Sequence, residues 1–426
     1  MPGPLDGIKM LEFTEIIAGP FGGMLLGDMG ADVIKIEPTW GEPWRFAQQF
    51  IPGESKTYMG LNRNKRSLPL DLTKPEAREI VNKLVETTDV VMINSRPDVP
   101  YNLGIDYETL SAINPRLIYC ENTAYGRKGP HNYRPGYDII VQAVSGLMAS
   151  EGKLVDGVPQ QITSTAVADF ATGIAIAWAV CGALYSREKT GKGQKIETTL
   201  LGTALAVQTS KFMQVAAIDD EPRKDFLRNL KEQRSAGVGY EKIHEDYTGQ
   251  NGPLRALRIG NIYYRTYQAK DGVLAVGCLS DPLRKKLCDV LELEDIRFEP
   301  DYDPQTEKAK EFGDALILKA EARFLLKSTD EWLAILDDVG VPAGPVRFVE
   351  ELVDDEQVLA NDLVVSLKHS LAGDLKMVGP LLKMSETPLE ARMASPALGE
   401  HTDLILGELD YSPEAIARLK DAGVTL

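Results

Sequence analysis

Cysteine and histidine are both scarce in this chain, and their scarcity argues against metal and disulfide chemistry. The 426 residues include only four of each. Neither residue type has the CxxC spacing or any other spacing typical of metal ligands. The cysteines are Cys120, Cys181, Cys278 and Cys288. We therefore expect reduced, structural thiols and no bound metal.

Basic charge and long apolar runs are lacking as well. The chain has 47 Lys and Arg against 63 Asp and Glu, a net charge of -16. This balance disfavours nonspecific binding to nucleic acids and to anionic membranes. No uninterrupted apolar run reaches the length of a membrane span, and the N-terminus does not resemble a signal peptide. We expect a cytoplasmic protein that binds no nucleic acid and no membrane, and whose anionic ligands need a local basic pocket.

The alternation of expected elements indicates an α/β protein. Residues 8–13 and 32–37 are typical of strands, and the glycine-rich segment between them is typical of a helix. The alternation continues through strands expected at residues 90–93, 117–121 and 195–199. This pattern predicts a doubly wound, Rossmann-like sheet. The glycines do not form the GxGxxG nucleotide motif, so NAD binding is a weak alternative.

The chain is longer than one typical domain, which predicts two packed units or one large unit with an insertion. Residues 219–251 are rich in charge and poor in apolar periodicity, and we interpret them as a linker. Beyond them, two strands about a DG turn and three helices are expected. These elements indicate a small α+β domain.

The segment Ile162–Leu184 is typical of an apolar helix that carries one carboxylate, Asp169. Large apolar side chains recur at helical spacing and small ones occupy the other faces, so we expect burial nearly all round. The large residues are Phe170, Ile174, Trp178, Cys181 and Tyr185. Asp169 would accept hydrogen bonds from the free N–H groups at the helix start, which would lower its pKa. From this segment alone, an ordinary helix cap is the simplest interpretation.

A basic cluster stands out in the acidic chain. Arg63, Lys65 and Arg66 are three cations within four residues. Arg96 follows an expected strand, at the edge where open α/β sheets bind their ligands. A phosphate-rich ligand would explain these cations. A solvated charged surface would explain them equally well, and the residues alone leave both interpretations open.

Ten motifs resemble, in order and spacing, those of the class III CoA-transferase family, also called CaiB/BaiF or formyl-CoA transferase-like. They are PLDGIKMLEF, IAGPFGGMLLGDMGADVIKIE, LNRNKRSLPLDL, NPRLIYC, RPGYDIIVQAVSG, VADFATG, TGKGQKIET, YYRTYQAKDG, VPAGPV and LGEHT. Each motif is weak alone, but together they are specific and span the chain. The resemblance implies a Rossmann-like large domain, an inserted small α+β domain and an interlocked homodimer. The large domain would comprise residues 1–220 and 346–426, and the linker and small domain residues 221–345.

The resemblance also implies a reaction and its nucleophile. In the family, the acidic residue of the VADFATG motif attacks the acyl-CoA, and that position is Asp169 here. The enzyme would move CoA from an acyl-CoA donor to a carboxylic acid acceptor through an aspartyl anhydride and an aspartyl-CoA thioester. Acyl-CoA and a small carboxylic acid would be its substrates, with no permanently bound cofactor.

The family's CoA-binding surface maps onto several turns of this chain. The residues that we expect to bind CoA are Ile16, Ile17, Ala18, Arg63, Lys65, Arg66, Leu72, Asn94, Arg96 and Tyr137. Among them, the basic cluster would pair with the nucleotide phosphates. Pro38 occupies a position that is often basic in formyl-CoA transferases, so Arg45 is a further candidate for phosphate pairing.

Two departures from the family pattern bear on the reaction. Residue 137 is tyrosine, where the related α-methylacyl-CoA racemases have their catalytic histidine, so a racemase is disfavoured. Residues 251–265 lack the glycine run of the lid in oxalate-specific members, which argues against formate and oxalate as substrates. The alternatives are an acyl-CoA isomerase, either racemase-like or catalysing intramolecular CoA migration, and a CoA-binding paralogue without activity.

Overall fold

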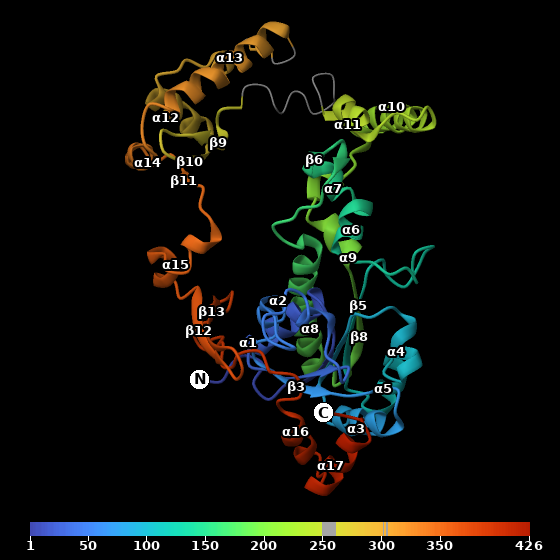
Figure 1. Ribbon diagram of the computed structural model, residues 1–426. Coiled ribbons are helices and arrows are strands. Elements are labelled where there is room, and N and C mark those ends of the chain that lie inside the picture. The colour runs from blue at the N-terminus through green and yellow to red at the C-terminus, as the bar shows by residue number, and fades with distance from the viewer. Residues whose placement is uncertain (249–260, 301, 304–305) are drawn as a thin grey trace. The chain divides into compact units, whose positions relative to one another are not determined.

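The computed structural model describes residues 1–248, 261–300, 302–303 and 306–426, and this part of the chain forms two compact units (Figure 1). The larger unit comprises residues 1–155, 159–220 and 356–426. The smaller unit comprises residues 156–158 and 221–355. Both ends of the chain therefore belong to the larger unit, which resumes at Glu356, whereas the sequence analysis placed this return at residue 346.

The larger unit is built on a six-stranded parallel sheet. Its strands are β1 (Lys9–Phe13), β2 (Asp32–Glu37), β3 (Lys65–Pro69), β4 (Val90–Ile93), β5 (Ile118–Thr123) and β8 (Gln194–Thr199). Their order is β3-β2-β1-β4-β5-β8, and every neighbouring pair is parallel. This doubly wound order confirms the Rossmann-like α/β fold. It also creates a switch point between β1 and β4, where the chain connections diverge.

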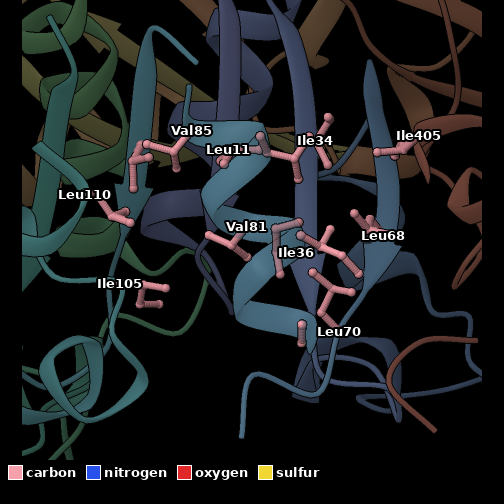
Figure 2. Close-up of a cluster of buried hydrophobic side chains, with 14 of the residues drawn as sticks. Leu11, Ile34, Ile36, Leu68, Leu70, Val81, Val85, Ile105, Leu110 and Ile405 are labelled. Atoms are coloured by element: carbon pink, nitrogen blue, oxygen red, sulfur yellow. The ribbon is translucent and has the colours of Figure 1, made fainter. Parts of the chain in front are cut away.

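Helices cover both faces of this sheet because side chains alternate along the strands. Helices α1 (Ala18–Asp28) and α8 (Val167–Thr190) pack on the face that bears Met10 and Met92. The other face is covered by α3 (Pro75–Val85), α5 (Tyr107–Ile113), α16 (Thr402–Glu408) and α17 (Pro413–Asp421). Figure 2 shows Leu11 and Ile34 in this second core beside Val81 of α3, with Ile405 of α16. The C-terminal helices thus complete a core that the N-terminal half begins.

The other elements of the larger unit are short. They are η1 (Pro43–Arg45), α2 (Lys56–Met59), α4 (Asp98–Leu103), α6 (Asp138–Ser145), α7 (Leu147–Glu151), β6 (Leu154–Val155), β7 (Val158–Pro159, which begins in the smaller unit), α9 (Leu200–Ala206), η2 (Thr209–Lys211), α15 (Glu356–Ala360), β12 (Val364–His369) and β13 (Gly373–Val378). Strands β12 and β13 form an antiparallel hairpin.

The smaller unit has its own sheet and core. Its antiparallel sheet has the order β11-β10-β9. At its centre the rings of Tyr267 and Phe324 stack with centroids 4.1 Å apart, and the ring of Trp332 lies tilted against Phe324 at 5.0 Å. Its elements are most of α10 (Ala216–Ser235), α11 (Tyr240–Thr248), β9 (Tyr264–Gln268), β10 (Val273–Gly277), α12 (Asp281–Leu291), η4 (Ile296–Phe298), α13 (Glu307–Phe324), α14 (Thr329–Asp338), β11 (Ala343–Pro345) and η5 (Val349–Glu351).

The segment interpreted as a linker is helical up to residue 248, which corrects that expectation. Helices α10 and α11 occupy most of it. Its dense charge forms helical ion pairs three and four residues apart, such as Lys224 with Glu221 and Lys242 with Asp246. Such pairs stabilise an exposed helix without an apolar face. The end of this segment and most of the segment compared with a lid, residues 249–260, lie outside the described residues.

Helix α8 is not buried all round, which corrects a second expectation. Ile174, Trp178 and Tyr185 are 52%, 78% and 64% exposed. The inward face carries Ile176, Val180 and Leu184 together with small residues. At Gly173 a Cβ would stand 2.9 Å from the Ala18 carbonyl oxygen, so the close approach of α1 requires a glycine there.

Helix α8 is also long and apolar enough to cross a membrane by length and composition, and half of its apolar window is buried in the protein. The core helix of a soluble protein passes the same test. The expected absence of membrane binding stays a prediction.

Candidate functional site

A cavity of about 470 Å³ opens at the carboxyl ends of the parallel strands. The cavity is lined by residues that come shortly after five of the strands. They are Glu15 after β1, Pro38 after β2, Leu72 after β3, Asn94 after β4 and Ala124 after β5. Ligands of open α/β sheets bind at this edge, near the switch point. The cavity thus lies where the fold predicts a binding site.

Four residues that the sequence analysis expected to bind CoA come together in this cavity. Leu72, Asn94, Arg96 and Tyr137 all line it. The cavity also contains Arg134, which the sequence analysis did not select although its RPGYD motif was recognised. Arg96 forms an ion pair with Asp98 at 2.9 Å, whereas no ion pair joins Arg134 to any residue in the described part of the chain.

The turn before α1 lies between this cavity and a second, apolar one of about 480 Å³. Glu15 lines the first cavity and Ile17 lines the second. Ala18 is buried in a cluster with Ala168 at the start of α8. Ile16 is half-buried and lines neither cavity. The expected CoA-binding segment from Ile16 to Ala18 therefore connects the two cavities to the start of α8.

The N-terminus of α8 is capped by Asp138 rather than by Asp169. Oδ1 of Asp138 accepts the backbone N–H of Ala168 at 2.8 Å and that of Asp169 at 3.4 Å. Gln142 donates to the other oxygen of Asp138 at 2.5 Å. Asp169 is the third residue of the helix, three positions past the N-cap residue Ala166, so it does not cap the helix. The cap comes from the GYD motif, 30 residues earlier in the chain.

The Asp169 carboxyl group is buried without a cation. Its residue is 8% exposed, and no hydrogen bond from the described residues reaches its carboxylate oxygens. Burial and, to a lesser degree, the nearby Asp138 charge raise the pKa of Asp169 to about 7. This reverses the expected lowering of the pKa, because the N–H groups that would have stabilised the carboxylate bond to Asp138. Phe170 lines the second cavity, and Tyr137, next to Asp138, lines the first.

The basic cluster serves the fold, which corrects the expectation that it pairs with phosphates. Arg63 is 1% exposed and binds Asp28 through two hydrogen bonds of 2.8 and 2.6 Å. Lys65 is fully buried and binds Glu12 at 2.9 Å. Arg66 is held by the carboxylates of Asp32 and Glu408, at 2.6 and 2.8 Å. The cations are thus committed to carboxylates of the fold, which leaves little surface for a phosphate, although Arg63 also lines the second cavity.

Arg45 is also committed to the fold. Its guanidinium group binds both oxygens of Glu37 at 2.8 Å and lies over the ring of Tyr58. It is fully buried, so it does not replace the missing cation at Pro38. The exposed cations Arg96 and Arg134 remain as the arginines that line the first cavity.

No metal centre is evident in residues 1–248, 261–300, 302–303 and 306–426. Among them, no group of three or more His, Cys, Asp and Glu side chains could hold a metal ion. The expectation that the protein uses no metal and no permanently bound cofactor stays a prediction.

The fold and the site define an α/β protein with a ligand-sized cavity at the carboxyl edge of its sheet and a buried carboxylate, Asp169, that lines neither cavity but lies at the start of α8. The chain belongs to CoA-transferase family III, whose family model matches residues 5–402. It is therefore a class III CoA-transferase, as the ten motifs predicted.

Relatives of known activity and structure agree with this assignment. Succinyl-CoA:glutarate CoA-transferase of Mus musculus is 32% identical over 99% of this chain and 90% of its own length. Formyl-CoA:oxalate CoA-transferase of Rhodopseudomonas palustris (strain BisB18) is 30% identical over 99% of this chain and 97% of its own length. The crystal structure of a CaiB/BaiF family protein from Brucella suis is 31% identical, with a TM-score of 0.74 over 96% of this chain and all of that one.

Proposed function

We propose that this CoA-transferase moves CoA from an acyl-CoA donor to a carboxylic acid through covalent intermediates on Asp169. The observation that carries this proposal is a buried carboxyl group with neither a cation nor a hydrogen-bond donor on its oxygens among the described residues. A structural carboxylate at such a depth is normally paired. Asp169 is instead left available for bond formation.

The reaction divides into four substitutions that conserve atoms and charge. The Asp169 carboxylate attacks the donor thioester carbonyl, which forms a mixed anhydride and expels CoA thiolate. The thiolate attacks the aspartyl carbonyl, which forms an aspartyl-CoA thioester and releases the donor acid. The acceptor carboxylate attacks this thioester and expels the thiolate again. The thiolate then attacks the acceptor carbonyl, which yields the new acyl-CoA and restores Asp169.

The position of Asp169 suits these intermediates. Anhydrides hydrolyse in water, and a side chain that is 8% exposed is largely shielded from water. The start of α8 also provides a positive dipole end near the developing oxyanion. Asp138 holds this helix end in place without donating a proton to Asp169.

We propose that CoA binds in the first cavity and along the turn from Ile16 to Ala18. Leu72, Asn94, Arg96 and Tyr137 would contribute the walls of the CoA site. The exposed Arg96 would meet the phosphates, a role for which the basic cluster, paired with carboxylates, is poorly placed.

The acceptor is proposed to be a small dicarboxylic acid such as glutarate. The named relatives transfer CoA to glutarate or to oxalate, both dicarboxylates. Arg134 lines the cavity without an ion pair to any described residue and could bind a second carboxylate. A panel of acyl-CoA donors against mono- and dicarboxylic acids tests this class. Equal kcat/KM for glutarate and for a monocarboxylate of the same length would contradict it.

We further propose that the protein works as an interlocked homodimer. The apolar stripe of Ile174, Trp178 and Tyr185 on α8 is exposed in one chain. Stripes of large apolar side chains on a soluble protein mark interaction surfaces. Sedimentation of the intact protein measures this directly, and a monomer at micromolar concentration would rule the dimer out.

The test of the nucleophile is Asp169→Asn, which keeps the shape and removes the attacking charge. We expect CoA exchange to fall on the order of a thousand-fold or more, because no intermediate can form. CoA binding by calorimetry should change little. The matched control is Asp156→Asn, an exposed aspartate with a left-handed backbone that asparagine also adopts. Exchange that survives in Asp169→Asn would assign the nucleophile elsewhere.

A further inference from the structure

The turn between β1 and α1 is held in an unfavourable backbone conformation. Ile16 has a φ of 72°. In this left-handed region, a β-branched residue such as isoleucine is a strained outlier. Such a conformation persists only where the surroundings hold it.

Three polar side chains from other elements clamp this turn. Lys35 donates to the Thr14 carbonyl oxygen at 2.8 Å. Asn94 accepts from the Glu15 N–H at 3.0 Å and donates to the Glu15 carbonyl oxygen at 2.8 Å. Oε2 of Glu42 accepts from the Ile16 N–H at 2.7 Å. Of these bonds, the one that Glu42 accepts is made by the strained residue Ile16 itself.

Glu42 is itself fixed in position. It is 1% exposed, and its Oε1 lies 3.0 Å from Nζ of Lys35. Lys35 also binds Glu12 at 3.1 Å, and Glu12 in turn binds Lys65. Glu12 is fully buried, and only a glycine fits at position 23, because a Cβ there would lie 1.8 Å from its Oε2. The clamp therefore rests on a rigid, buried chain of charges.

We propose that Glu42 is a positioning residue for acyl-CoA, which holds Ile16 in its left-handed conformation and thereby sets the walls of both cavities. Glu15 lines one cavity and Ile17 the other, so a change of φ at Ile16 would move both walls. The consequence for CoA rests on the proposed function, in which CoA lies along this turn. Asn94 has the same kind of role, because both ends of its amide bond to the backbone of Glu15.

The experiment is a double-mutant cycle between Glu42→Gln and Ile16→Gly, with Kd for CoA measured by calorimetry and KM and kcat measured in turnover. Glu42 uses one oxygen for the Ile16 N–H and the other for the Lys35 ammonium group. A glutamine has only one oxygen, so its NH2 group must face one of these two donors. In the protein that keeps Ile16, we expect Glu42→Gln to raise Kd and KM about ten-fold with a small change in kcat. The reason is that the bond that holds Ile16 in its left-handed conformation is weakened. Glycine adopts positive φ freely, so in the Ile16→Gly background Glu42→Gln should change Kd less than about three-fold.

The matched control is Glu54→Gln, a buried carboxylate that pairs with Arg45 and has no bond to the turn. It should leave the Kd for CoA unchanged even where it lowers the melting temperature. An equal rise of Kd in both Ile16 backgrounds, or no rise in either, would overturn the proposal, as would the same Kd change in Glu54→Gln. The Kd for CoA is measured without turnover, so the two proposals can fail separately. If the Kd values follow the expected double-mutant cycle but the protein transfers no CoA, the proposed reaction is refuted and the role of Glu42 stands.

Discussion

Two buried carboxylates of the larger unit, Glu12 and Asp169, have opposite surroundings. Glu12 is fully buried between the ammonium groups of Lys35 and Lys65, 3.1 and 2.9 Å away. Asp169 is almost as deeply buried, yet its nearest charged neighbour is another acid, Asp138. The same residue chemistry at similar depth is therefore neutralised in one place and left unpaired in the other.

The partner, and not burial, makes the difference between these two acids. The carboxylates around Lys35 hold its pKa above its ordinary value although burial alone would lower it, so the ammonium stays charged. Around Asp169, burial and Asp138 act in the same direction and raise the pKa to about 7. Perturbed acids of this kind are typical of functional sites. The predictions below change one side of this contrast at a time.

The largest expected effect comes from breaking the paired side with Glu12→Ala. The substitution leaves Lys35 and Lys65 buried without the carboxylate that they share. We expect the free energy of unfolding to fall by about 3–5 kcal/mol, measured by urea denaturation, because unpaired buried charges are costly.

The comparison for this prediction is Asp32→Ala, which removes a carboxylate that is 43% exposed from its pair with Arg66. An exposed pair should contribute less than about 1 kcal/mol. If the free energy of unfolding fell by the same small amount in both variants, Glu12 would not be the centre of a stabilising network.

An opposite and smaller effect is expected on the unpaired side with Asp169→Asn. The folded-state pKa of Asp169 is raised to about 7 from an ordinary value of 3.8, so between these values the folded protein binds more protons than the unfolded one. Its stability must then fall as the pH rises through this window. Asparagine does not titrate and should remove this loss.

We therefore expect the inactive variant to be more stable than the wild type at pH 8, and the difference at pH 8 to exceed that at pH 5 by about 2 kcal/mol. Chemical denaturation at both pH values measures it. A pH-independent difference between the two proteins would mean that the Asp169 carboxyl group titrates normally in the folded state.

Much of this contrast could not be predicted from the sequence because it depends on distant partners. Strand alternation and the helix after Pro75 follow from local patterns, and the sequence analysis placed β2 and β4 at the bounds that the structure has. The partner of Lys65 is 53 residues away, so three adjacent cations resembled a phosphate site. The local sequence shows which residues are charged, but it does not show which distant residues they form ion pairs with.

The same limit applies at α8. The spacing of Trp178 and Tyr185 predicts an apolar stripe correctly, but which face turns inward depends on the close approach of α1 at Gly173. Asp169 was selected through its resemblance to the family motif, whereas Asp138, which caps the helix, was not selected although it stands in RPGYD. A motif locates a residue, while its hydrogen-bond partners require the fold.

The smallest effect is expected for Asp138→Asn, which removes the acid that lies near Asp169. The asparagine oxygen can still accept the Ala168 N–H, so the cap on α8 should persist, but the amide NH2 group loses the bond from Gln142 and the melting temperature should fall modestly. The charge that helps to raise the pKa of Asp169 is removed. The acid limb of kcat/KM, which reports the ionisation of the free enzyme, should move to lower pH by roughly one unit.

The direction of this change distinguishes two roles for Asp138. A less basic Asp169 is ionised at lower pH but is also a weaker nucleophile, so kcat/KM should rise near pH 6 and fall slightly on the plateau above pH 8. If Asp138 acted only as a helix cap, the profile would keep its midpoint in Asp138→Asn and lose height in Asp138→Ala. A limb that moved to higher pH would show that Asp138 stabilises the Asp169 carboxylate, the reverse of the electrostatics inferred from their burial and proximity.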